Sequence, residues 1–169
     1  MRTLFNLDMK DYDPKGTAVV RPAVRGIIIR DGKLAMVHSL KYDYYKYPGG
    51  GIDAGETMSD TLIREVREEA GLQVIPHTIR EFGFVHQIQK GVLEDIFIQE
   101  NYYFLCDVED SPIPQELDGY EAEECFTLEW VEPECVIRAN RAACSGPKNP
   151  TMLMREVRVL EILQQEGYV

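Results

Sequence analysis

A proline followed by three glycines, at residues 48–51, constrains the fold more than any other feature, because an amphipathic helical pattern follows it closely. Glycine backbone can approach a neighbouring chain or a ligand, and its carbonyl oxygens can coordinate a metal ion. Over residues 58–70, apolar side chains recur at four-residue spacing and predict a helix. Thr57 with Asp60 predicts a capping box at its start, and Gly71 predicts a left-handed cap at its end.

The predicted helix carries three glutamates beside its apolar stripe. At 100° per residue, Glu65, Glu68 and Glu69 share one arc, and Glu69 projects at the edge of the stripe. Like charges three or four residues apart cost on the order of a few tenths of a kcal/mol, and more beside an apolar wall. Such a run is commonly a solvated face, but its position after the glycine loop favours a site for Mg²⁺ or Mn²⁺, which carboxylates bind well.

The rest of the chain predicts an α+β domain, with a mixed sheet flanked by helices. Asp31 and Gly32 separate two apolar runs, which predicts a tight hairpin. A terminal helix should begin after Asn149 and Pro150. We expect one domain over residues 1–169 and make no assignment for residues 132–148. The expected strands are residues 21–30, 33–40, 72–75, 79–89, 95–108 and 125–131, and the expected terminal helix is residues 151–166.

Composition narrows the classes of function. The net charge of −11 argues against duplex nucleic acid and anionic membrane surfaces as partners, since both require a positive footprint. The sequence contains no run of 18 apolar residues, so we expect no membrane span. The N-terminus lacks the apolar segment of a secretory signal. The four cysteines form no Cys-x-x-Cys pair, which indicates reduced thiols and a cytoplasmic location.

The glycine loop and the acidic helix together match a known signature. Gly50, Glu56 and the run Arg64–Leu72 agree with every fixed position of the Nudix box, G-x5-E-x7-R-E-U-x-E-E-x-G-U. The lead-in at residues 47–51 and Trp130 ahead of the final helix also look like the layout of this family. The chain therefore resembles a Nudix hydrolase. This resemblance implies an α/β/α sandwich with a loop-helix-loop metal site.

The resemblance also implies roles for the residues of the box. Mg²⁺ or Mn²⁺ would be bound by Glu65, Glu68 and Glu69. The backbone carbonyl of Gly49 would join them, and Glu56 would support the site directly or through water. A further residue, Arg64, is expected to orient the glutamates through charge-assisted hydrogen bonds.

The implied reaction is hydrolysis of a phosphoanhydride by water that attacks phosphorus in line. Two positions are open for the general base. One is Glu65, and the other is a glutamate of the acidic loop before Trp130, which contains Glu121, Glu123 and Glu124. From that loop we select Glu124. A solvated acidic turn is the simpler interpretation of the same three residues.

Substrate contacts are expected outside the box. We expect Arg25 to bind phosphate, and we expect Tyr45 and Tyr47 to stack on a base. Core packing is the commoner role of a single tyrosine. Further candidates are Arg21, Lys41, Tyr42, Tyr44 and Lys46. The substrate class implied is a nucleoside diphosphate linked to another moiety, such as an ordinary or oxidised nucleoside triphosphate or a nucleoside-diphosphate sugar.

Two further questions stay open at this stage. A protein of this fold can also bind a nucleotide as a sensor without cleaving it, but such proteins usually lose box glutamates, and this chain keeps them all. The N-terminal segment and the terminal helix are candidates for a homodimer interface.

Overall fold

Two sheets form the centre of the protein in the computed structural model, which describes residues 1–169. The first sheet is mixed and has the strand order β1-β6-β7-β2, with β1 parallel to β6, β6 antiparallel to β7, and β7 parallel to β2. In the second sheet, β3, β5 and β8 all pair antiparallel with β4. The strands are β1 (Thr3–Asp8), β2 (Ala18–Ile27), β3 (Ile29–Arg30), β4 (Lys33–Ser39), β5 (Tyr44–Lys46), β6 (Arg80–Lys90), β7 (Ile96–Leu105) and β8 (Phe126–Val131).

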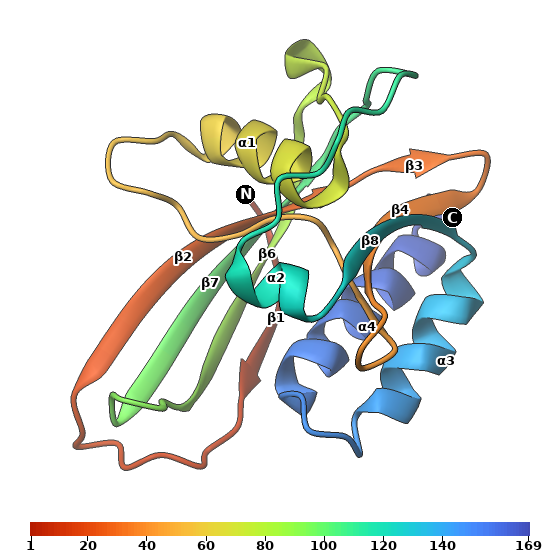
Figure 1. Cartoon of the computed structure of the whole chain (residues 1–169). Coiled ribbons are helices and arrows are strands. Elements are labelled where there is room, and N and C mark those ends of the chain that lie inside the picture. Colours follow the sequence, from red (N-terminus) through yellow and green to blue (C-terminus); the bar gives the residue numbers. More distant parts are fainter.

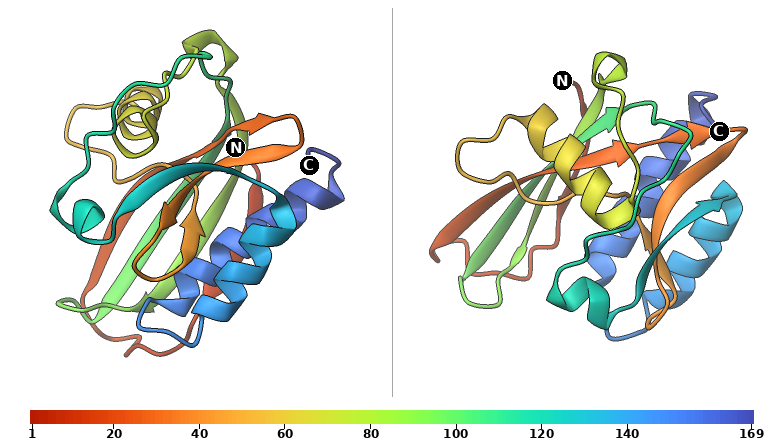
Figure 2. Two further views of the ribbon diagram at one scale, coloured as in Figure 1. Left: turned by 45° about the vertical axis from the view of Figure 1, so that its right-hand side comes forward. Right: turned by 45° about the horizontal axis from the view of Figure 1, so that its top comes forward.

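Helices cover the sheets from both sides, as Figures 1 and 2 show. Helix α1 (Met58–Ala70) packs on one side, and α3 (Pro133–Ala143) with α4 (Pro150–Gln165) packs on the other. A short helix, α2 (Gly119–Glu123), precedes β8, and a 3₁₀ turn covers Pro76–Thr78. This arrangement confirms the predicted α/β/α sandwich. None of the helices combines the length and apolar character that crossing a bilayer requires.

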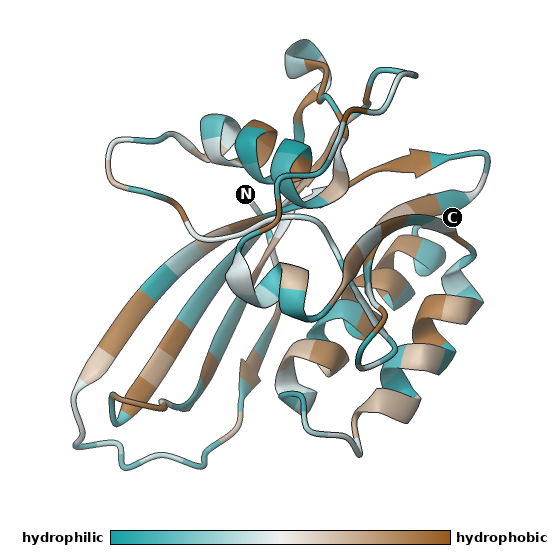
Figure 3. Cartoon of the chain, viewed as in Figure 1, coloured by the Kyte–Doolittle hydropathy of each residue, from teal (hydrophilic) through white to brown (hydrophobic).

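The apolar core has two main parts, one on each side of the sheets. Beneath α1, Leu62 and Val66 pack against Val24 of β2. On the other side, α3 and α4 contribute residues such as Val136 and Leu160. Figure 3 shows the corresponding bands of apolar and polar residues alternating along the strands of the first sheet. Alternation with a period of two is what a strand shows when its two faces have different surroundings.

The predicted hairpin forms, but its first arm is divided between the two sheets. Asp31 and Gly32 both have positive φ, at 51° and 74°, as a tight turn of this type requires. The chain leaves the first sheet after Ile27 and enters the second at Ile29. This switch lets one continuous apolar run connect the two sheets.

Local signals at helix ends were reliable. The capping box of Thr57 and Asp60 is present, and Gly71 adopts the left-handed conformation with φ of 62°. The side chain of Asn149 accepts a hydrogen bond from the backbone N–H of Thr151, 2.9 Å away, and so starts α4.

One predicted strand is wrong, and several elements were not predicted. Residues 72–75 form only an isolated bridge between Val74 and Val108, because the chain turns there into the loop after α1. Strands β1 and β5 and helix α2 were missed. Helix α3 lies within the unassigned residues 132–148, although Pro133 at its first position was a usable signal.

Candidate active site

The glycine loop lies along the free edge of β2. The backbone N–H of Val24 donates to the carbonyl of Gly50 over 2.9 Å, and Gly26 donates to Pro48 over 2.8 Å. An isolated bridge pairs Ala23 with Gly51. The loop therefore continues the first sheet by a few residues and is held between β2 and α1.

This position explains why three glycines follow one another. At Gly49, φ is 142°, and an added Cβ would overlap the carbonyl oxygen of Val24. A Cβ on Gly50 would lie 2.5 Å from the carboxylate of Glu65. On Gly51 it would lie 3.0 Å from the guanidinium of Arg21. Each glycine is therefore needed for a different close contact: Gly49 with the backbone of β2, Gly50 with Glu65 and Gly51 with Arg21.

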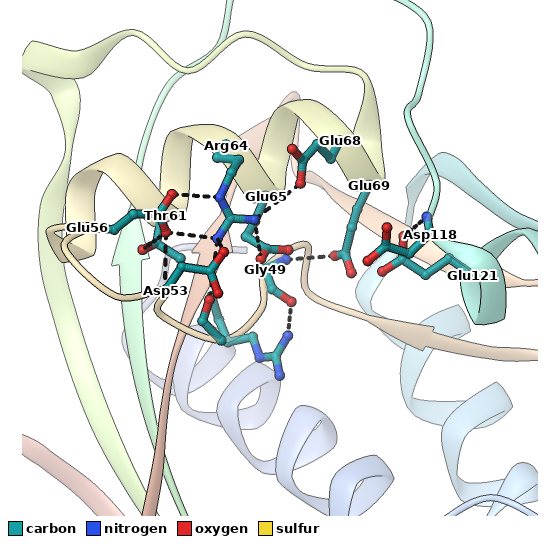
Figure 4. Close-up of polar contacts among 12 residues, drawn as sticks. Gly49, Asp53, Glu56, Thr61, Arg64, Glu65, Glu68, Glu69, Asp118 and Glu121 are labelled. Carbon is teal, nitrogen blue, oxygen red and sulfur yellow. Dashed lines mark hydrogen bonds and ion pairs between the residues drawn. The ribbon is translucent and has the colours of Figure 1, made fainter.

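Arg64 is the centre of a cluster of carboxylates from α1 and the loop before it (Figure 4). Its guanidinium donates to Glu56 and Glu65, each over 2.7 Å, and to Glu68 over 3.2 Å. The hydrogen bonds from Arg64 and from Thr61 lower the pKa of Glu56 to about 2. Burial raises the pKa of Glu65, although Arg64 opposes this effect. Arg64 therefore has the orienting position that the box implies.

Glu69 faces the loop and not the solvent. Its side chain is 2% exposed and accepts hydrogen bonds from the ammonium group of Lys46 and from the backbone N–H of Gly49, the latter over 2.8 Å. In Figure 4 the carboxylate of Glu121, from α2, approaches that of Glu69. Burial, with the charge of Glu69 adding to it, raises the pKa of Glu121. The charge of Lys46, which pairs with Glu69, opposes this rise in the pKa of Glu121.

A divalent cation at this site would compete with Arg64 and Lys46 for the box glutamates. As the side chains stand, no group of three or more His, Cys, Asp or Glu residues is gathered closely enough to hold an ion, because Arg64 and Lys46 occupy the carboxylates. The chemistry of the donors nevertheless fits Mg²⁺ or Mn²⁺, which prefer carboxylate and carbonyl oxygens. Glu65 and Glu69 both contact the glycine loop, whose Gly49 carbonyl accepts a hydrogen bond from Arg25 as the side chains stand. Burial raises the pKa of Glu65 and of Glu121, so a cation bound beside them would favour their ionised forms.

A cavity of about 320 Å³ opens on the other side of the glycine loop. Residues 49–51 form part of its wall, together with side chains from β2, β5, β7, α2, β8 and α4. Its charged lining is mostly cationic, with five basic side chains and one acidic one. These are Arg21, Arg25, Lys46, Lys148, Arg155 and Glu124. Although the protein is acidic overall, positive charge is concentrated in this cavity beside the box glutamates.

Arg25 lines this cavity, as expected for a residue that binds phosphate. The prediction that Tyr45 and Tyr47 stack on a base does not agree with the structure. Because side chains alternate along β5, Tyr44 and Lys46 face the cavity while Tyr45 faces away. Tyr45 stacks on His38 with ring centroids 4.2 Å apart, and its hydroxyl donates to Glu129. Tyr47 is fully buried in the core. Neither ring is available to a substrate in this conformation.

The structure also corrects the choice of Glu124 within the acidic loop. Its buried carboxylate accepts hydrogen bonds from Lys148, from Tyr44 over 2.8 Å and from Ser39 over 3.0 Å. Burial alone would raise the pKa of Glu124, but these donors together lower it. Glu124 is therefore an ionised structural acceptor on the cavity wall. Glu121, three residues earlier, is the loop glutamate that lies beside α1.

Sequence reasoning had one usable signal for Glu121. Asp118 and Glu121 form a capping box at the start of α2, with the backbone N–H of Asp118 donating to Glu121 over 2.9 Å. No local pattern pointed to Lys148, Asn149 or Arg155, because they reach the cavity from the loop before α4 and from α4 itself.

Comparison with known proteins identifies the family. The NUDIX domain model matches residues 20–149, well over half of the chain. The chain therefore belongs to the Nudix hydrolase family.

Similar proteins come from several bacteria and an archaeon. Over 134 residues, 73% of this chain and 78% of the relative, it is 31% identical to an RNA pyrophosphohydrolase from Gluconobacter oxydans. Over 53 residues, 30% of this chain and 31% of the relative, it is 36% identical to an ADP-ribose pyrophosphatase from Methanocaldococcus jannaschii. Among solved structures, a NUDIX hydrolase from Nitrosomonas europaea has a TM-score of 0.60 at 19% identity, covering 85% of this chain and 90% of its own. This likeness confirms the fold.

Proposed function

We propose that the protein hydrolyses, with Mg²⁺ or Mn²⁺, a phosphoanhydride bond in a nucleoside diphosphate linked to another moiety. The chain is a Nudix-type hydrolase acting on diphosphate bonds, and its relatives include an RNA pyrophosphohydrolase and an ADP-ribose pyrophosphatase. The substrate would belong to one of two classes: nucleoside triphosphates, ordinary or oxidised, or nucleoside-diphosphate sugars.

One observation carries this proposal: the glycine loop is shared between the box glutamates and the cationic cavity. Gly49 donates its N–H to Glu69 and accepts a hydrogen bond from Arg25 through its carbonyl oxygen. Gly50 lies directly against Glu65. A diphosphate held at the loop would therefore meet the carboxylate side and the cationic side at once, as in-line hydrolysis requires.

The residues of the chain have distinct tasks in this reaction. Glu65, Glu68, Glu69 and the carbonyl of Gly49 would hold the metal ion, which supplies charge neutralisation and acidifies the attacking water. Arg64 keeps Glu65 and Glu68 in place through its hydrogen bonds.

Proton transfer is assigned to the loop glutamate beside α1. Oε2 of Glu121 accepts a hydrogen bond from the backbone N–H of Asp118, and the second oxygen, Oε1, would accept the proton of the attacking water. The raised pKa of Glu121 suits a base that must hold this proton. As the water oxygen bonds to phosphorus, the bond to the bridging oxygen breaks, and Arg25 and Lys46 lie near the charge that develops.

The test is a panel of nucleoside triphosphates and nucleoside-diphosphate sugars, run with Mg²⁺, with Mn²⁺ and with EDTA. Wild type is compared with Glu69→Gln, Glu121→Gln and the matched control Glu123→Gln, whose side chain is exposed and pairs with Lys41. We expect Glu121→Gln to lower kcat by about 100-fold or more, while Glu123→Gln has little effect. Nucleotide binding without turnover on any substrate would instead favour the sensor alternative.

A further inference from the structure

Two of the cavity's five cations have no carboxylate partner. Lys46 pairs with Glu69, Lys148 with Glu124, and Arg155 with Glu156. By contrast, the two arginines that β2 contributes, Arg21 and Arg25, form no ion pair with any carboxylate of the chain. In a protein with a net charge of −11, two guanidiniums without a carboxylate partner in one cavity favour an anionic ligand there.

Arg25 is held with an unfilled donor. Its side chain is 8% exposed, and one of its terminal nitrogens donates to the carbonyl of Gly49. Its Nε is buried and has no hydrogen-bond partner. A guanidinium presents five donors and cannot lose its charge, so an unpaired buried donor costs free energy unless an anion arrives to accept it.

Arg21 lies four residues earlier on the same face of β2. At about 3.3 Å per residue, the two Cα atoms are roughly 13 Å apart. The guanidinium of Arg21 packs against Gly51, whereas Arg25 bonds to Gly49. Positive charge therefore runs along the whole glycine loop, from the end beside Glu69 to the exposed mouth of the cavity.

The far wall adds further groups that favour an anion. The N-cap residue Asn149 lines the cavity, so the positive end of the 16-residue helix α4 lies there. Beside it, Lys148 forms part of the same wall. A nucleoside-diphosphate sugar presents only a neutral ring beyond its diphosphate, which would leave Arg21 and this helix end without an anionic partner.

The aromatic lining of the cavity offers a base only one accessible ring. Phe126 meets Tyr44 and Tyr120 edge to face, with interplanar angles of 88° and 85°. The ammonium group of Lys46 lies 5.1 Å from the centroid of Phe126. Tyr44 and Phe126 are buried, whereas Tyr120 is 56% exposed, so one ring at most is open to stack on a base. Stacking on a single ring tolerates every base.

We infer that the substrate is a linear chain of three or more phosphates, and that Arg21 selects it by binding a phosphate beyond the scissile anhydride. This inference rests on the proposed function and decides between its two substrate classes. Recognition depends on the phosphate chain, so different bases should be tolerated. The chemistry is shared by nucleoside triphosphates and dinucleoside polyphosphates.

The experiment measures kcat and KM for ATP, GTP, diadenosine tetraphosphate and a UDP-sugar with Mg²⁺. Wild type is compared with Arg21→Met and with Arg138→Met, which removes an exposed guanidinium without an ion pair from α3. We expect kcat/KM for the better polyphosphate to exceed that for the UDP-sugar by about tenfold or more, with ATP and GTP alike. Arg21→Met should lose most of this preference through KM, and Arg138→Met should keep it.

A binding measurement separates failure of this inference from failure of the proposed function. Calorimetry in EDTA compares inorganic tripolyphosphate with methylenediphosphonate on the same three proteins. Tighter binding of tripolyphosphate that Arg21→Met removes supports the inference even if no substrate is turned over. Preference for the UDP-sugar, strong selection between ATP and GTP, or equal effects of Arg21→Met on all substrates would overturn it while leaving metal-dependent hydrolysis intact.

Discussion

Replacing Gly49 by alanine is the sharpest test of how the loop is built. The residue is buried, its φ is 142°, and its backbone bonds to both Glu69 and Arg25. An added methyl group would overlap the carbonyl oxygen of Val24 and lie 3.0 Å from the Cα of Arg25. Both neighbours are strand backbone, which cannot swing aside as a side chain can.

The expected loss of stability follows from two contributions. Forcing alanine into this region of φ costs about 1–3 kcal/mol. Overpacking against backbone adds about 1–3 kcal/mol. Gly49→Ala should therefore lower the free energy of unfolding by about 2–6 kcal/mol. Gly32→Ala is the matched control, because Gly32 also has positive φ, at 74°, but has nothing within 4 Å of the added atom. It should cost only about 1–2 kcal/mol.

Urea unfolding followed by circular dichroism measures both changes directly, provided that the dependence of the free energy on urea is similar in the two variants. For a chain of this length, each kcal/mol also corresponds to roughly 2–4 °C in Tm. If Gly49→Ala lost no more stability than Gly32→Ala, the close approach of the loop to β2 would be wrong. The explanation given for the three glycines would then fail.

Three further variants test the buried groups around the site. Glu69→Gln should abolish turnover and, in metal-free protein, lower the free energy of unfolding by about 2–4 kcal/mol, because the buried Lys46 loses its partner; Lys46→Met in the same chain should restore part of this loss in urea unfolding. The lowered pKa of Glu124 contributes stability above its unfolded pKa that is lost as the pH falls through the folded one, so Glu124→Gln should flatten the decline in Tm measured below about pH 5. Tyr47→Phe removes a buried hydroxyl that has no partner, and it should leave kcat/KM unchanged and raise stability by about 1 kcal/mol; a large loss of activity would restore Tyr47 to the substrate site.

Three expectations from the sequence remain predictions: a possible homodimer, a single domain over residues 1–169, and Mg²⁺ or Mn²⁺ as the metal ion. Size-exclusion chromatography with light scattering would determine whether the protein is a dimer. A comparison of activity in Mg²⁺ and in Mn²⁺ would determine which metal ion it uses.

The sequence by itself determined the elements whose causes are local. A capping box and a left-handed cap delimit α1 within a few residues, and a pair of residues with positive φ makes the turn before β4. The box motif likewise identified Arg64 and its glutamates, since a helix of known period places residues three and four apart on one side. Those predictions required no knowledge of distant segments.

Only the tertiary structure decided which residues line the cavity beside the glycine loop. Tyr44 was preferred over Tyr45 by the register in which β5 pairs with β4, and a shift of one residue would have reversed the choice. Glu121 of α2 lies beside Glu69, whereas Glu124 at the end of the same helix accepts hydrogen bonds from Lys148 and Tyr44. Lys148 reaches the cavity only because α4 packs across the sheet. Local patterns fix backbone conformation within a few residues, whereas a cavity is made by side chains that meet only after distant segments have packed together.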